Sequence, residues 1–238
     1  MTMFDLIIRK AQACGIAMSE VQAGKFEMYH KMLTERNRQT NLTAVPEDIE
    51  EAIDRNYLDC ISVLKFESLK DIQTAIDVGS GAGFPGIPLS IMCPWIRFTL
   101  MDSLGKRVDF LNEVIDALDL NAAAVHMRAE DGAVKPELRE SFDLATARAV
   151  AAVNVLSEYL LPFVRIGGTM LVYKGPNLSA EMEEAENAIR TLGGVPLRTY
   201  DVSIPGRDWE HKLALIEKRT VTPARYPRRA GKPEKKPL

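Results

Sequence analysis

The sequence of 238 residues is poor in cysteine and histidine, the side chains that most often build disulfide or metal frameworks. The three residues of each kind are scattered along the chain: Cys14, Cys60 and Cys93, and His30, His126 and His211. An odd number of widely spaced cysteines argues against a disulfide scaffold, and scattered histidines argue against a zinc cluster. We therefore predict reduced thiols in a cytoplasmic protein and no metal site.

Long apolar runs are also missing. No stretch approaches the roughly 20 apolar residues that span a bilayer. Near the N-terminus, Asp5, Arg9 and Lys10 interrupt the apolar residues before a signal-peptide core could form. The sequence predicts a protein with no membrane partner, built as one large domain or as one domain with a smaller attachment.

Charge of one sign gathers only at the C-terminal end. The net charge is −3, yet the segment from Lys218 to Leu238 carries eight Lys and Arg residues against the single acid Glu234. Residues 220–238 are also rich in proline, so we predict a flexible basic tail there. Such a tail indicates a polyanionic partner or merely improves solubility, and the tail alone favours neither interpretation.

The chain before this tail divides into two parts. Residues 1–70 show helical periodicity, whereas residues 71–219 alternate between short apolar runs and helical patterns. The alternation predicts a doubly wound α/β sheet whose last two strands pair antiparallel, because no helix separates them. A mostly parallel sheet with such a terminal hairpin is typical of Rossmann-like methyltransferases. The expected strands are 74–78, 97–101, 122–127, 142–147, 169–173, 195–204 and 212–216.

Three helices are expected in the N-terminal region. Apolar residues recur on one helical face over 4–11, with Gly15 as the stop. Ser19 and Gln22 have the spacing of a capping box that opens a second helix. We expect this helix to break in the polar run 35–41, and a third helical pattern to extend over 49–64.

A glycine-rich turn follows the first expected strand. Residues 77–86 read Asp-Val-Gly-Ser-Gly-Ala-Gly-Phe-Pro-Gly and lie between a strand and a helix, where open α/β sheets bind ligands. Gly81, Gly83 and Gly86 match the dinucleotide fingerprint, which predicts an NAD(P)-dependent oxidoreductase. The preceding Asp77 instead favours a methyl donor, because its carboxylate can organise the loop near a cationic ligand. Asp102, after the second strand, suits the ribose of either ligand.

Several further segments resemble one family closely. They are Asn-Leu-Thr-Ala at 41–44, the glycine turn extended to Pro88, Asp-Ser-Leu-Gly-Lys-Arg at 102–107, Arg-Ala-Glu-Asp at 128–131, Thr-Ala-Arg-Ala-Val at 146–150, Lys-Gly-Pro at 174–176 and Tyr-Pro-Arg-Arg-Ala-Gly at 226–231. Together they resemble the RsmG (GidB) family of 16S ribosomal RNA guanine N7-methyltransferases. The resemblance implies S-adenosyl-L-methionine as cofactor and guanine-527 of 16S ribosomal RNA, free or in a small-subunit particle, as the target. At Asn56 this chain departs from the family, which has histidine.

The resemblance also implies roles for individual residues. The expected cofactor-binding set is Gly79, Gly81, Gly83, Phe84, Asp102, Ser103, Ala129, Glu130 and Arg148. Arg148 is further expected to position a reactant. The expected RNA-binding set is Arg36, Arg38 and Asn41 on a polar turn, with Lys174, Arg228 and Arg229. No general base is expected, since N7 carries a free lone pair. A non-catalytic RNA-binding protein with this fold remains a third alternative.

Overall fold

The computed structural model describes residues 2–40, 42–67, 69–148 and 150–238. Its helices are α1 (Met3–Ala13), α2 (Glu20–Thr40), α3 (Ile49–Ala52), η1 (Ile53–Leu58), α4 (Asp59–Ile61), η2 (Ser62–Lys65), α5 (Gly86–Met92), α6 (Gly105–Leu118), α7 (Ala129–Gly132), α8 (Val153–Leu160), α9 (Leu178–Glu184), α10 (Glu186–Thr191) and α11 (Lys232–Lys235). Its strands are β1 (Thr74–Val78), β2 (Arg97–Asp102), β3 (Ala122–His126), β4 (Phe142–Arg148), β5 (Val164–Lys174), β6 (Gly194–Val202) and β7 (His211–Lys218).

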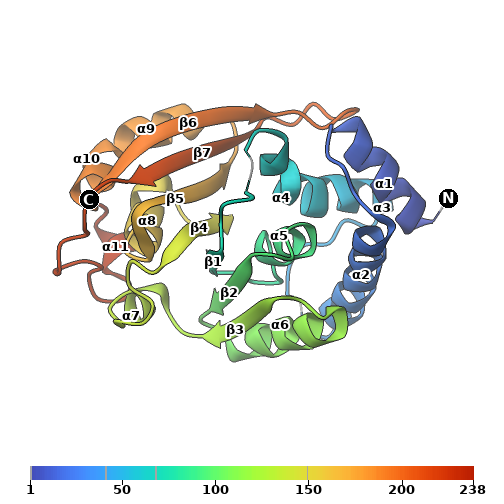
Figure 1. The fold of residues 1–238 in the computed structure, drawn as a ribbon, viewed down its shortest axis with the longest axis horizontal. Helices are drawn as coiled ribbons and strands as arrows, with labels where there is room; N and C mark the ends of the chain where they lie inside the picture. The colour runs from blue at the N-terminus through green and yellow to red at the C-terminus, as the bar shows by residue number, and fades with distance from the viewer. Residues whose placement is uncertain (1, 41, 68, 149) are drawn as a thin grey trace.

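The seven strands form one mixed sheet in the order β3-β2-β1-β4-β5-β7-β6. The first five strands run parallel, and β7 pairs antiparallel with both β5 and β6 (Figure 1). The α/β class and the antiparallel terminal hairpin are therefore confirmed. Because the order reverses at β1, the loop after this strand opens at the point where doubly wound sheets bind ligands.

Two hydrophobic layers cover the two faces of the sheet. Along β1, Ala75 belongs to one core and Ile76 and Val78 to the other, as the alternation of side chains along a strand requires. The first core packs α5 and α6 on the sheet and continues into the N-terminal helices, while the second lies beneath α8 and α10. The N-terminal helices thus share a core with the sheet domain.

The N-terminal region confirms the expected helix starts. Gln22 N–H donates to Ser19 Oγ at 3.2 Å and Ser19 N–H donates to Gln22 Oε1 at 2.8 Å, so the capping box is present. We expected the helix to break within the polar run 35–41, with Arg36 and Arg38 on a turn. This placement of the two arginines is wrong, because α2 continues to Thr40 and includes both. The third helical pattern contains a π-helical turn at η1 between α3 and α4.

The segment after β7 differs from the expected flexible tail. It lies against the α8 side of the sheet and ends in the short helix α11 (Figure 1). Tyr226 is buried, and Arg228 and Gly231 make hydrogen bonds to the domain. The composition of the segment did not predict these contacts, because they depend on partners far away in the sequence.

The structure also bears on the predictions about disulfides, metal sites and membrane spans. Cys14, Cys60 and Cys93 are free and buried. Within the described ranges, His, Cys, Asp and Glu nowhere gather in a group of three or more that could hold a metal. No helix among the described residues is long and apolar enough to cross a membrane.

Candidate active site

The loop between β1 and α5 is built on positive φ angles. Gly79, Gly81 and Gly83 have φ values of 74°, 62° and 108°, which L-residues with a side chain rarely adopt. The backbone N–H of Gly79 donates to Met101 O on β2 at 2.8 Å, so the loop is pinned to the neighbouring strand. A Cβ at Gly79 would lie 2.9 Å from Val150 Cγ2, so a side chain there would have to displace Val150 as well as adopt a strained φ.

Asp77, near the end of β1, holds this loop through hydrogen bonds. Its buried Oδ2 accepts hydrogen bonds from Ser80 Oγ at 2.6 Å and from Gly86 N at 3.0 Å. Burial raises the pKa of Asp77 to about 6, and the bonds from Ser80 and Gly86 oppose the rise. The carboxylate therefore ties the beginning of the glycine turn to the first residue of α5.

A cavity of about 450 Å³ opens above the loop at the carboxyl ends of β1, β2 and β4. It is lined by Leu42, Thr43, Val78, Gly79, Ser80, Gly81, Ala82, Phe84, Met101, Asp102, Ser103, Arg107, Met127, Arg128, Ala129, Glu130, Arg148, Val150, Tyr159, Gly231 and Glu234. Eight of the nine expected cofactor-binding residues belong to this set; Gly83 does not. A volume of this size falls in the range of cofactor sites.

Gly83 has a packing role instead. A Cβ there would lie 2.5 Å from Ile87 Cγ1 and 2.8 Å from the Tyr29 hydroxyl. That hydroxyl donates to Ala82 O at 2.6 Å, so α2 supports the glycine turn directly. The N-terminal helices thereby help to shape the cavity.

Asp102 is held at the end of β2 with only 2% of its surface exposed. Its Oδ2 accepts from Gly81 N at 2.8 Å, and its Oδ1 accepts from Leu104 N at 2.9 Å. Arg107 Nη1 lies 3.4 Å from Oδ2. Two carboxylate oxygens offer about four lone-pair sites, so acceptor capacity remains for ligand hydroxyls.

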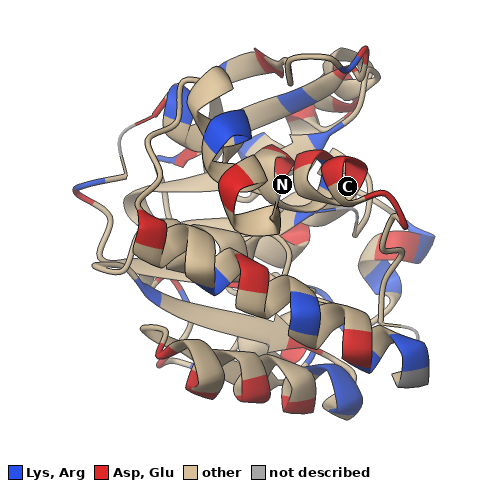
Figure 2. Cartoon of the chain, turned by 90° about the vertical axis from the view of Figure 1, so that its right-hand side faces the viewer, with Lys and Arg blue, Asp and Glu red and all other residues tan. Residues whose placement is uncertain are grey.

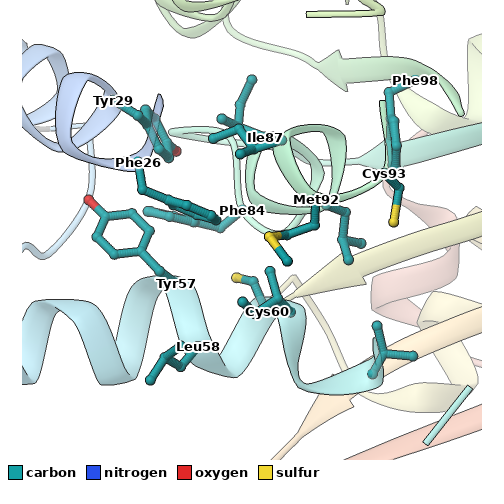
Figure 3. Close-up of a cluster of buried hydrophobic side chains, with 14 of the residues drawn as sticks. Phe26, Tyr29, Tyr57, Leu58, Cys60, Phe84, Ile87, Met92, Cys93 and Phe98 are labelled. Carbon is teal, nitrogen blue, oxygen red and sulfur yellow. The ribbon is translucent and has the colours of Figure 1, made fainter. Parts of the chain in front are cut away.

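Phe84 and Arg148 form a further part of the cavity wall. The guanidinium carbon of Arg148 lies 4.8 Å from the centre of the Phe84 ring, a cation–π arrangement. Arg148 Nη1 donates to Arg55 O at 2.8 Å and to Asp59 Oδ2 at 3.0 Å. Phe84 packs in turn among Tyr29 and Tyr57 (Figure 3). The Arg148 side chain is therefore fixed before any ligand arrives.

Asn56 is the residue at which the resemblance led us to expect histidine. It is 3% exposed, and its Nδ2 finds no hydrogen-bond partner within the described part of the chain. Asn56 does not line the cavity, although Asp59, three residues further on, binds Arg148. An unsatisfied polar group therefore lies close to the wall of the site.

The expected RNA-binding residues fall into three groups. Three of the cations are engaged within the protein: Arg36 pairs with Glu113 on α6, Lys174 Nζ lies 2.6 Å from Glu181 Oε2, and Arg228 Nη2 lies 2.5 Å from Glu158 Oε2. Arg38 and Arg229 are exposed. Asn41 lies outside the described residues. Figure 2, which faces the right-hand side of Figure 1, shows Lys and Arg interspersed with Asp and Glu along the helices on that side.

Residues far from the glycine turn complete the cavity without having been expected there. Arg107, Met127 and Tyr159 line it, as do Gly231 and Glu234 from the C-terminal segment. The match of residues 226–231 to the family was a signal that this segment matters. It carried no information about where the segment lies, because only the folded chain brings it beside α7 and α8.

Solved structures place this architecture in a known class. M. jannaschii TYW2 in complex with AdoMet aligns with a TM-score of 0.53 at 15% identity, covering 69% of this chain and 77% of that one. The M. jannaschii fibrillarin pre-rRNA processing protein aligns with a TM-score of 0.51 at 13% identity, covering 65% and 70%. The sheet order, the glycine turn and these neighbours define a Rossmann-like methyltransferase fold.

Sequence comparisons identify the family within that class. The family model GidB, rRNA small subunit methyltransferase G, matches residues 22–208. The ribosomal RNA small subunit methyltransferase G of Clostridium perfringens strain 13 is 46% identical over 100% of both chains. The protein of the same name from Clostridium botulinum strain Eklund 17B is 47% identical over 100% of both. This chain belongs to the rRNA small subunit methyltransferase G family.

Proposed function

We propose that this protein transfers a methyl group from S-adenosylmethionine to N7 of a guanine in 16S ribosomal RNA, in the cytoplasm. The observation that carries the proposal is the cavity at the switch point, where the glycine turn and the buried Asp102 meet. The residues present fit the donor: Gly79 and Gly81 expose backbone where a ligand must approach, and Asp102 keeps lone pairs for the two ribose hydroxyls. Family membership supplies the substrate class.

The chemistry demands positioning rather than proton removal. The bound donor supplies an electrophilic methyl group, and guanine N7 already carries the lone pair that attacks it. Arginine side chains stay protonated in proteins, so Arg148 cannot act as a base. Held by Asp59 and Arg55, its guanidinium can orient an anionic group, either the donor carboxylate or an RNA phosphate.

Two measurements separate the three alternatives for this fold. Calorimetry should detect binding of S-adenosylmethionine and no binding of NADH, whereas the reverse would support an oxidoreductase. Labelled methyl groups should enter 16S ribosomal RNA. Donor and RNA binding without incorporation would indicate a non-catalytic RNA-binding protein.

We expect Gly79→Val to weaken donor binding severely in a protein that still folds. The substitution places a branched side chain at φ 74° and in contact with Val150, and the strain alone costs about 1–3 kcal/mol. Gly206→Val is the matched control, since Gly206 has φ 83° in the β6–β7 turn and its Cβ would meet open space. Calorimetry on both variants checks the expectation; equal donor affinities would remove Gly79 from the site.

We expect Arg38→Ala combined with Arg229→Ala to weaken RNA binding and leave donor affinity unchanged. Both side chains are exposed, and each phosphate that they no longer neutralise should reduce the slope of log affinity against log salt by roughly 0.7 for single strands. Arg36→Ala is the comparison, because Glu113 already neutralises that cation. An unchanged slope in the double variant would show that neither arginine meets a phosphate.

A further inference from the structure

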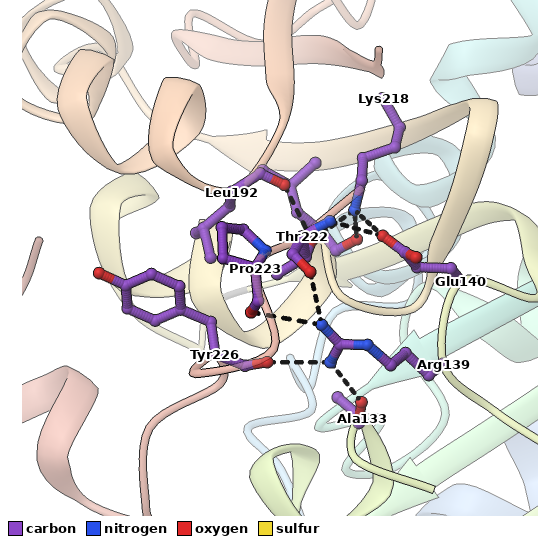
Figure 4. Close-up of polar contacts among 9 residues, drawn as sticks. Ala133, Arg139, Glu140, Leu192, Lys218, Thr222, Pro223 and Tyr226 are labelled. Carbon is purple, nitrogen blue, oxygen red and sulfur yellow. Dashed lines mark hydrogen bonds and ion pairs between the residues drawn. The ribbon is translucent and has the colours of Figure 1, made fainter. Parts of the chain in front are cut away.

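Hydrogen bonds hold the beginning of the segment that follows β7 against the rest of the domain. Arg139 Nη1 donates to Ala133 O at 3.0 Å and to Tyr226 O at 2.9 Å, and its Nη2 donates to Thr222 O at 2.8 Å (Figure 4). Beside it, the buried Lys218 Nζ donates to Thr222 Oγ1 at 2.5 Å and lies 3.1 Å from Glu140 Oε1. One guanidinium and one ammonium thus fix the chain as it leaves the sheet.

Arg228 fixes the middle of the segment. Its backbone N–H donates to Glu158 Oε1 at 2.6 Å, and its guanidinium donates to both Glu158 oxygens. Glu158 is 1% exposed, so this ion pair is buried on the Glu158 side. Arg228 Nη1 also donates to Lys236 O at 2.8 Å, which ties the end of α11 to the same point. These contacts bring residues 229–235 to a defined place on the domain.

That place is one end of the cavity. Gly231 N–H donates to Glu130 Oε1 at 3.0 Å, and the Tyr159 hydroxyl donates to Glu234 Oε1 at 3.2 Å. Burial, with help from Glu130 and Glu234, raises the pKa of Tyr159, so its hydroxyl stays a neutral donor. All four residues line the same cavity as Asp102. Two carboxylates, Glu130 after β3 and Glu234 from α11, therefore meet at this end.

We infer that the C-terminal segment forms part of the donor pocket and that Glu234, together with Glu130, recognises the amino group of the donor's adenine. The inference rests on the proposed function. The sheet order places the glycine turn after β1, Asp102 at the end of β2 and Glu130 after β3. The cavity therefore runs from the glycine turn past Asp102, the expected ribose ligand, to the two glutamates. Carboxylates only accept hydrogen bonds, and the adenine amino group donates them.

A purine with oxygen in place of that amino group should be rejected. Its O6 would face carboxylate lone pairs where the amino group donated, and its N1 would carry a proton where adenine N1 accepts. A site built for a hydrogen bond from the amino group discriminates strongly against an analogue that cannot make it. Asp102 and the glycine turn would treat the two ligands alike. The ratio of the two affinities therefore reports on the groups around the amino edge of the purine, and its change in a glutamate variant reports on that glutamate.

The test compares S-adenosylhomocysteine with S-inosylhomocysteine by calorimetry on the full chain. The wild type should prefer the adenosyl ligand, and Glu234→Gln should reduce this preference roughly tenfold, because an amide can either accept or donate. Glu183→Gln, on the exposed surface of α9 and outside the cavity lining, is the control and should keep the wild-type ratio. A folded Glu234→Gln protein with the wild-type ratio would overturn the inference.

A second variant covers the case in which Glu234→Gln fails to fold. Tyr159→Phe removes only the hydroxyl that holds Glu234, so it should weaken binding of the adenosyl ligand and lower the same ratio. An unchanged ratio in this variant would also overturn the inference. Wild-type protein that binds neither ligand would count against the proposed function, an outcome distinguishable from both of these.

Discussion

Replacing Asp102 by alanine should lower the affinity for S-adenosylmethionine by roughly a hundredfold or more. The carboxylate is expected to accept hydrogen bonds from two ribose hydroxyls, and bonds to charged groups contribute about 1.5–3 kcal/mol each, where 1.4 kcal/mol is a factor of ten. The variant also deprives Gly81 N–H and Arg107 of their acceptor, so the glycine turn loses a support. Calorimetry measures the affinity directly.

Asp109→Ala is the matched control, since Asp109 is an exposed carboxylate on α6 that does not line the cavity. It should bind the donor as the wild type does. If a folded Asp102→Ala protein bound the donor within threefold of the control, the ribose would have to lie elsewhere.

Replacing Arg228 by alanine should destabilise the protein by about 3–5 kcal/mol, the usual cost of leaving one member of a buried ion pair without its partner. Glu158 is 1% exposed and receives three hydrogen bonds from the Arg228 guanidinium, none of which alanine could make. The free energy of unfolding, obtained from denaturant titration, checks the expectation.

The neighbouring Arg229 supplies the control for this experiment. Its side chain is exposed, and Arg229→Ala should change the free energy of unfolding by no more than about 0.5 kcal/mol. Equal destabilisation of the two variants would contradict a structural role for the Arg228–Glu158 pair. Weaker RNA binding by Arg228→Ala without any change in stability would restore the role expected from the sequence.

The sheet and the glycine turn could be predicted because their signals are local. The short strand before Gly79 is mostly apolar and therefore buried, and the alternating glycines after it permit the positive φ angles of a tight turn. The same holds for the capping box at Ser19. Asp102 could be placed at the cavity because the carboxyl ends of neighbouring parallel strands meet at one edge of the sheet.

The roles of the charged residues could not be predicted in the same way. In the sequence, Arg36 and Arg228 both read as exposed cations. In the structure, Arg36 is neutralised by a carboxylate 77 residues away and Arg228 by one 70 residues away. Proline and lysine in the tail have the composition of a flexible segment, although Gly231 reaches Glu130 across 101 residues. Such pairings are set by tertiary packing, which overrides composition.

The proposed activity is tested most directly by locating the transferred methyl group. Purified protein would be incubated with 16S ribosomal RNA, or with the small-subunit particle, and labelled S-adenosylmethionine, and the modified nucleoside would be identified and mapped. We expect 7-methylguanosine at a single guanine, because the cavity offers positioning groups and N7 needs no base. A label on a ribose oxygen, on an exocyclic amino group or on another base would contradict this expectation.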